Sequence, residues 1–74
     1  MTTERFRTTL RQQPFRSFTI RMADGRAIDV VHPDFVAPSK SGRTVIVVQP
    51  DESYHVLDHL LMSELQVHAA NGRS

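Results

Sequence analysis

Residues 18–30 read FTIRMADGRAIDV, and this stretch decides the fold. Apolar and polar residues alternate on both sides of Asp24-Gly25, which is the pattern of a half-buried strand. Asp-Gly between two such runs is the strongest short-range signal for a β-hairpin. We therefore expect an antiparallel hairpin over residues 18–22 and 27–31, with one buried face. That face comprises Phe18, Ile20, Met22, Ile28 and Val30.

The residues before the hairpin predict a short helix. Phe6 and Leu10 are four apart and therefore share one helical face. Pro14 sets the end, because a residue that precedes proline avoids helical backbone angles. We expect a helix over about residues 3–13. Two apolar anchors cannot hold so short a helix in water, so Phe6 and Leu10 must dock on the sheet.

The middle of the chain predicts further strands. Pro33 interrupts the ladder because proline cannot donate a backbone hydrogen bond, and residues 35–37 form a brief extended piece that Pro38 closes. Residues 44–48 read TVIVV, a nearly continuous β-branched run that fits a strand buried on both sides. In total we expect strands at about 17–23, 26–32, 43–49, 53–58 and 63–68.

The C-terminal third leaves two alternatives. Leu57, Leu61 and Leu65 keep helical spacing and Asn71-Gly72 is a good helix stop, which together indicate a helix over about 56–70. The other interpretation is a helical turn at residues 60–62 followed by a strand. We prefer the turn and strand because of a family resemblance described below. Residues 69–74 are expected to be frayed.

The size and composition bound the kind of protein. A chain of 74 residues is one domain, residues 1–74. It has no cysteine, which excludes disulfides and Cys-based zinc sites. Association is the natural source of extra stability for so small a domain, so we expect a homo-oligomer. No run approaches the roughly 18 apolar residues of a membrane span, and the N-terminus has no apolar signal core. We expect a cytoplasmic protein without a membrane partner.

The charge is unevenly distributed. Residues 1–26 hold six arginines against two acids, a balance of +4, whereas residues 27–74 hold three basic residues against six acids, a balance of −3. A basic face could meet phosphates or an acidic partner. An ordinary solvated surface gives the same asymmetry. Both interpretations stay open at this point.

The chemistry-bearing residues form no known catalytic pattern. The three glycines are too far apart for a phosphate loop, and the serines lie in no nucleophile elbow. His55 and His59 are four apart and could share a metal ion on a helix, but on a strand and a turn they point differently. We expect no catalytic residue, no metal site and no cofactor, and therefore no enzyme.

Three segments resemble the Sm-like fold, in particular its Hfq-like variant. Residues 7–12 resemble the N-terminal helix with its basic rim, residues 18–26 resemble the first Sm strand and its turn, and residues 53–61 resemble the second Sm motif. The resemblance implies a mainly β (α+β) domain. In it, a short N-terminal helix precedes a strongly bent five-stranded antiparallel sheet or small barrel, Sm-like or SH3-like.

The resemblance also implies a function. Sm-like proteins pair edge strands to form rings, and they bind RNA around the central pore. This chain would then be a non-enzymatic homo-oligomer that binds single-stranded RNA. Three features depart from the Hfq pattern. Asp58 replaces a lysine, Asp34 replaces a glutamine, and the interval from Phe35 to His59 is longer than in the family. The implied RNA-binding residues are a base-stacking Phe35, a pore-facing His59, and an outer rim of Arg7, Arg11 and Arg16.

A second resemblance implies no activity. Residues 13–15, 24–26 and 32–35 read QPF, DGR and HPDF, a combination similar to short uncharacterised bacterial proteins. The alternative function is therefore a small β-barrel module that docks a protein partner by adding a strand or filling a groove. The candidate surfaces are the region of Phe15 and Phe18 and the strand of Tyr54.

Overall fold

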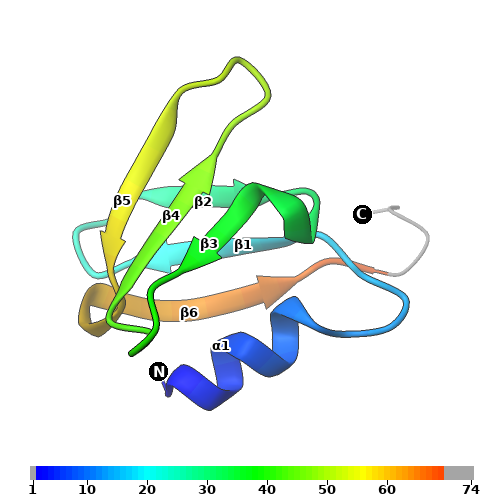
Figure 1. The fold of residues 1–74 in the computed structure, drawn as a ribbon, viewed down its shortest axis with the longest axis horizontal. Helices are drawn as coiled ribbons and strands as arrows, with labels where there is room; N and C mark the ends of the chain where they lie inside the picture. Colours follow the sequence, from blue (N-terminus) through cyan, green and yellow to red (C-terminus); the bar gives the residue numbers. More distant parts are fainter. Residues whose placement is uncertain (1, 70–74) are drawn as a thin grey trace.

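The computed structural model describes residues 2–69, and Figure 1 shows their arrangement. One helix, α1, comes first, and two short 3-10 turns, η1 and η2, separate strands later in the chain. The bounds in chain order are α1 Thr3–Leu10, β1 Phe18–Met22, β2 Ala27–Val30, η1 Pro33–Phe35, β3 Val36–Pro38, β4 Thr44–Val48, β5 Tyr54–Asp58, η2 His59–Leu61 and β6 Met62–Val67.

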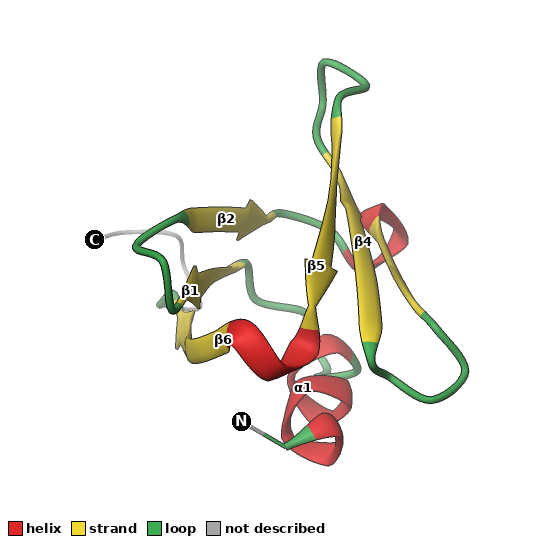
Figure 2. Ribbon diagram, turned by 90° about the vertical axis from the view of Figure 1, so that its left-hand side faces the viewer, coloured by secondary structure: helices red, strands yellow, loops and turns green. Residues whose placement is uncertain are grey.

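The described strands form two three-stranded antiparallel sheets. The first sheet has the order β2-β1-β6, and the second has the order β3-β4-β5. Figure 2 shows the β4–β5 hairpin crossing the direction of β2. The predicted mainly β domain with one short N-terminal helix is thereby confirmed, and its described strands lie in two sheets. The extra strand, β3, arises because Pro33 and η1 end β2, after which Val36 pairs with Val47.

The hairpin of β1 and β2 confirms the prediction from alternation. Phe18 pairs with Val30 and Ile20 with Ile28. All five residues of the predicted inner face are at most 4% exposed. The turn is closed by Gly25 at φ 95°, a conformation that glycine adopts without strain. The inner face of this sheet and that of the second sheet share one apolar core.

Helix α1 closes the core from one side. Phe6 is 1% exposed, and its ring meets the edges of Phe18 and His59 at centroid distances of 6.2 Å each. Leu10 packs partly buried against the same cluster. The predicted docking is therefore confirmed, but the helix ends at Leu10 and not at residue 13. Arg11 leaves the helical region at ψ 6°, and the Gln12 side-chain amide donates to the Arg16 carbonyl at 2.9 Å, which stabilises a loop instead.

The start of α1 rests on the turn between β3 and β4. Gly42 in that turn is buried at φ 80°, and a Cβ there would collide with the side chain of Thr3. The Arg7 guanidinium donates to the Lys40 carbonyl at 3.1 Å. These contacts join the N-terminal helix to the second sheet.

The C-terminal third is a turn and a strand, so the alternative helix over 56–70 is wrong. The Asp58 carboxylate accepts from the Leu60 amide at 2.9 Å and caps η2. β6 then pairs with β1, with Leu65 opposite Ile20. Residues 70–74, which include most of the predicted frayed tail, lie outside the described residues. Within residues 2–69, no helix has the length and apolar character needed to cross a bilayer.

Candidate functional site

The outer surface of the second sheet is apolar and exposed. Four side chains form it, and we call them the apolar face. The register pairs Ile46 with Val56 and Val48 with Tyr54, so the four residues make one contiguous patch. The exposed fractions are 37% for Ile46, 39% for Val48, 65% for Tyr54 and 60% for Val56.

This face corrects the prediction that β4 is buried on both sides. Val45 and Val47 are 0% exposed because they point into the core. Their neighbours Ile46 and Val48 point the other way and stay accessible. Large exposed apolar patches on small proteins mark sites of interaction. The β-branched run of β4 therefore has a covered side and an uncovered side.

Strand β5 contributes Tyr54 and Val56 to the apolar face, and it lies at an edge of the described sheet. The His59 amide donates to the Arg43 carbonyl at 2.8 Å, and the Gln49 amide donates to the Ser53 carbonyl at 2.7 Å. In an antiparallel ladder such pairs alternate with pairs whose backbone groups point outward. Tyr54, Val56 and Asp58 consequently direct their amide and carbonyl groups away from β4. We call these three residues the β5 edge.

The β5 edge carries little protection against strand addition, because its one charged residue, Asp58, lies at the end of the strand and pairs with Arg43. Natural edge strands are commonly blunted by lysine, proline or a bulge. Residues 54–58 read YHVLD, with no lysine, arginine or proline. Two of the three edge residues, Tyr54 and Val56, carry the most exposed side chains of the apolar face. An extended chain could therefore add to this edge and cover apolar side chains at the same time.

Both ends of β5 are held by side chains. At its C-terminal end, the hydrogen bond from the Leu60 amide, followed by that from the Arg43 guanidinium at 3.2 Å, lowers the pKa of Asp58. At the other end, the Ser53 hydroxyl and amide donate to Asp51 at 2.6 and 3.0 Å and lower its pKa. The ionised carboxylates thus fix the turn before β5 and the turn after it.

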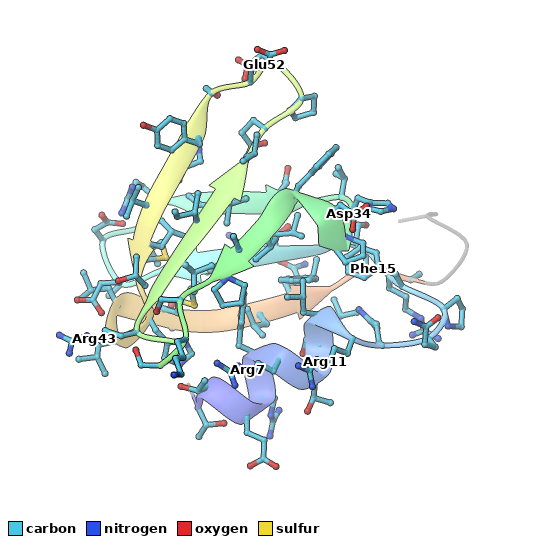
Figure 3. The ribbon with its side chains drawn as sticks, viewed as in Figure 1. Arg7, Arg11, Phe15, Asp34, Arg43 and Glu52 are labelled. Carbon is cyan, nitrogen blue, oxygen red and sulfur yellow. The ribbon has the colours of Figure 1, made fainter. Side chains whose placement is uncertain are left out.

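The predicted basic rim is divided between the helix and the loop after it. Arg7 and Arg11 line a surface depression of about 460 Å³ on α1, together with Thr3, Glu4 and Thr8. Figure 3 shows both arginines at the opposite end of the molecule from Glu52. Arg16 is exposed on the loop after the helix. The structure therefore brings two of the three arginines together.

Phe35 belongs to a row of rings at the end of the first sheet. Its ring lies 5.9 Å from His32, which lies 6.4 Å from Phe15. Phe15 and Phe35 are both partly buried, whereas the His32 side chain is 57% exposed. Phe15 is next to Arg16 in the chain. The row of rings therefore connects two parts of the predicted RNA site, Phe35 and Arg16.

His59, the predicted pore-facing residue, is buried in the single chain. It is 5% exposed, because η2 turns its ring inward against Phe6. Its predicted role in RNA binding stays a prediction. His55 lies partly buried on β5. Within residues 2–69, no group of three or more His, Cys, Asp or Glu side chains could hold a metal ion.

The outer surface of the first sheet carries a polar network that the sequence did not reveal. The Thr19 hydroxyl lies 2.8 Å from the Asp29 carboxylate and 3.0 Å from His68 Nε2. Because a carboxylate only accepts, the hydroxyl proton goes to Asp29 and His68 acts as the donor. His68 cannot then act as a base toward this hydroxyl. The network joins β2, β1 and the residue after β6, and 49 positions separate Thr19 from His68.

No protein-family model, no curated protein and no solved structure matches this chain. Function is therefore inferred from the chain's own residues.

Proposed function

We propose that this protein is a non-enzymatic interaction module that binds an extended protein segment at the β5 edge. The observation that carries the proposal is the coincidence of a weakly protected edge strand with exposed apolar side chains. Strand addition provides backbone hydrogen bonds for affinity, while alternate side chains provide specificity. Here the alternate side chains are those of Tyr54 and Val56, which lie on the apolar face.

The rest of the molecule supports this function by holding β5 rigidly. On its inner face Leu57 is 1% exposed within the core. Asp51 and Asp58 anchor the two ends through the hydrogen bonds described above. A strand that is already ordered loses little conformational entropy when a partner pairs with it. The β5 edge is therefore a prepared template and not a segment that must fold on binding.

The test is a titration with a capped peptide of alternating valine and threonine, flanked by lysines for solubility. We expect the amide resonances of Tyr54, Val56 and Asp58 to shift most. Val56→Pro should abolish the shifts, because it removes an outward amide without touching the ladder to β4. Val48→Thr is the matched control, since it changes the same face away from the edge. Shifts centred on β2, β3 or β6 would contradict the proposal.

A second candidate function is the binding of single-stranded RNA by an Sm-like oligomer. If β2 and β3 are counted as one strand bent at Pro33, the strand order becomes β6-β1-β2/β3-β4-β5. That order is consistent with the five-stranded bent sheet or small barrel expected from the resemblance. The observation that favours RNA is the aromatic row that ends at Phe35, with Arg16 in the loop beside Phe15. Stacking on such rings contributes about 1–3 kcal/mol per base.

Binding of U-rich and A-rich oligonucleotides at low salt tests the second candidate. Replacing Arg7, Arg11 and Arg16 together by alanine should abolish RNA binding, because it removes the basic side chains that would contact phosphate. The fold should be retained, because substitutions of exposed residues such as Arg11 and Arg16 usually cost under about 0.5 kcal/mol each. The loss of the Arg7 bond to the Lys40 carbonyl adds about 1 kcal/mol. Arg26→Ala, in the hairpin turn, is the control. RNA binding lost with the first three arginines, together with no peptide binding at β5, would favour RNA over strand addition.

A further inference from the structure

We propose that the segment added to the β5 edge is the same strand of a second copy, so that two chains pair β5 to β5 about a twofold axis. This inference rests on the proposed strand addition and names its partner. In the pairing, Val56 lies opposite Val56 of the other copy and Tyr54 lies opposite Asp58. The two second sheets then join into one continuous sheet.

The register follows from the backbone of β5. Tyr54, Val56 and Asp58 point their amide and carbonyl groups outward. This follows from the hydrogen bonds that the His59 amide donates to the Arg43 carbonyl and the Gln49 amide donates to the Ser53 carbonyl. An antiparallel copy can use all three residues only when position 56 meets itself. Shifting the register by two residues loses one of the three pairs. A register shifted by one residue would place His55 and Leu57 at the new edge contact, although their amide and carbonyl groups already point toward β4.

The side chains of this register complement one another. Val56 packs against its own copy, and β-branched pairs are favourable across antiparallel strands. The Tyr54 hydroxyl comes beside the Asp58 carboxylate of the other chain, where an acceptor is available for its proton. The two Asp58 groups lie on opposite sides of the axis, and each is neutralised by Arg43 of its own chain at 3.2 Å. No like charges meet at the centre.

The charges along the hairpin also suit an antiparallel copy. Asp51 and Glu52 are exposed in the turn before β5, whereas Lys40 and Arg43 are exposed near the opposite end of the sheet. Figure 3 shows Glu52 and Arg43 far apart in the molecule. A twofold axis at Val56 brings the acidic end of each copy toward the basic end of the other. This complementarity distinguishes a second copy from an unrelated strand.

Like charges introduced at the twofold axis test the pairing. Val56→Lys places two lysines face to face, and Val56→Glu places two glutamates face to face. Each variant should weaken dimerisation at least about tenfold relative to the unaltered chain. An equimolar mixture of the two should recover the dimer, since lysine then meets glutamate. The readout is molar mass by light scattering over a concentration series, with circular dichroism to verify folding.

Two controls fix the register. Tyr54→Lys should retain the dimer, because the new ammonium meets Asp58 of the other copy. In the cysteine-free chain, Val56→Cys should form a disulfide-linked dimer on oxidation, whereas Val48→Cys should not, because its strand lies inside the sheet. Cross-linking at Val48 in preference to Val56 would indicate face-to-face stacking and would overturn the edge pairing.

The remaining outcomes separate this inference from the function on which it rests. A monomer at every concentration whose β5 resonances still respond to the valine–threonine peptide overturns self-pairing and leaves strand addition standing. A monomer that ignores the peptide overturns both. An assembly larger than a dimer that survives both Val56 charge variants overturns self-pairing and indicates contacts through another edge.

Discussion

The two sheets have the same number of strands and the same inward apolar alternation, but their outer surfaces differ. On the first sheet, Arg21 donates to Gln66 at 2.7 Å, and the Thr19 hydroxyl links Asp29 to His68. On the outer surface of the second sheet, Ile46 and its cross-strand partner Val56 stand where the first sheet has these polar side chains. The first sheet has an outer surface suited to water. The second has an apolar outer surface, although nothing in the stability of the core requires the difference.

This difference teaches that burial of one face does not determine the chemistry of the other. Both sheets contribute residues that are 0% exposed to a common core, among them Ile20 from the first and Val45 from the second. Polar residues on the outer surface of the second sheet would leave that core unchanged. We therefore interpret its apolar outer surface as a feature that serves binding.

The largest expected effect separates the two faces of β5 itself. Leu57→Ala should lower the free energy of unfolding by about 2–5 kcal/mol, because it opens a cavity at a residue that is 1% exposed. Val56→Thr, on the next residue, should change it by about 0.5 kcal/mol or less at monomeric concentrations. Urea denaturation of both variants measures the contrast. Equal losses would show that the outer face is also a stability element.

A second comparison concerns the attachment of α1 to the second sheet. Gly42→Ala should cost about 1–3 kcal/mol, because it combines a left-handed backbone with a collision against Thr3. Gly25→Ala is the matched control, since its φ is also positive but a Cβ there meets no atom within 4 Å. Thermal unfolding of both variants isolates the contribution of the helix contact. If the two variants lose the same stability, only backbone strain matters at Gly42.

A smaller effect is expected from the polar network of the first sheet. Thr19→Val keeps the branched shape but removes the hydroxyl, and should cost about 1 kcal/mol. His68→Ala in the Thr19→Val background should cost less than it does alone, because the two side chains share a hydrogen bond. A double-mutant cycle by urea denaturation measures this coupling. Full additivity would indicate that the network contributes no joint stability.

The smallest effect is the pH dependence contributed by Asp58. Its pKa is lowered from 3.8 by the Leu60 amide and then by Arg43, so folding favours the ionised form. The stability that Asp58 contributes is therefore complete above pH 3.8 and is lost as the pH falls through the lower folded value. Asp58→Asn should match the unaltered chain at the acid end and be less stable near neutrality. Arg43→Gln should retain part of the dependence, because the Leu60 bond remains.

Much of the fold was predictable because it depends on local patterns. The alternation around Asp24-Gly25 specified the first hairpin, its register and its buried face. The Phe6–Leu10 spacing specified which side of α1 docks. These features follow from side-chain periodicity and turn chemistry, which neighbouring residues determine.

The features that were not predicted depend on tertiary contacts between residues that are distant in the sequence. The run of β4 suits burial on both sides, and no local signal in Ile46 or Val48 tells whether a second layer exists. The Thr19–His68 contact joins residues 49 positions apart, so its partners could not be paired from sequence. The resemblance implied a pore-facing His59, yet η2 turns its ring toward Phe6. Of the candidate site, the sequence predicted only that the strand of Tyr54 could be an interaction surface. The contribution of Ile46 and Val48 was not predicted.

The short turn at Pro33–Phe35 has a consequence for how this architecture tolerates insertions. In an uninterrupted strand shared by two sheets, one inserted residue would invert every side chain beyond it. Here the β1–β2 register and the β3–β4 register are set by separate hairpins. We therefore expect the turn to absorb a residue inserted beside Asp34, so that either half of the domain could be lengthened without changing the strand register of the other.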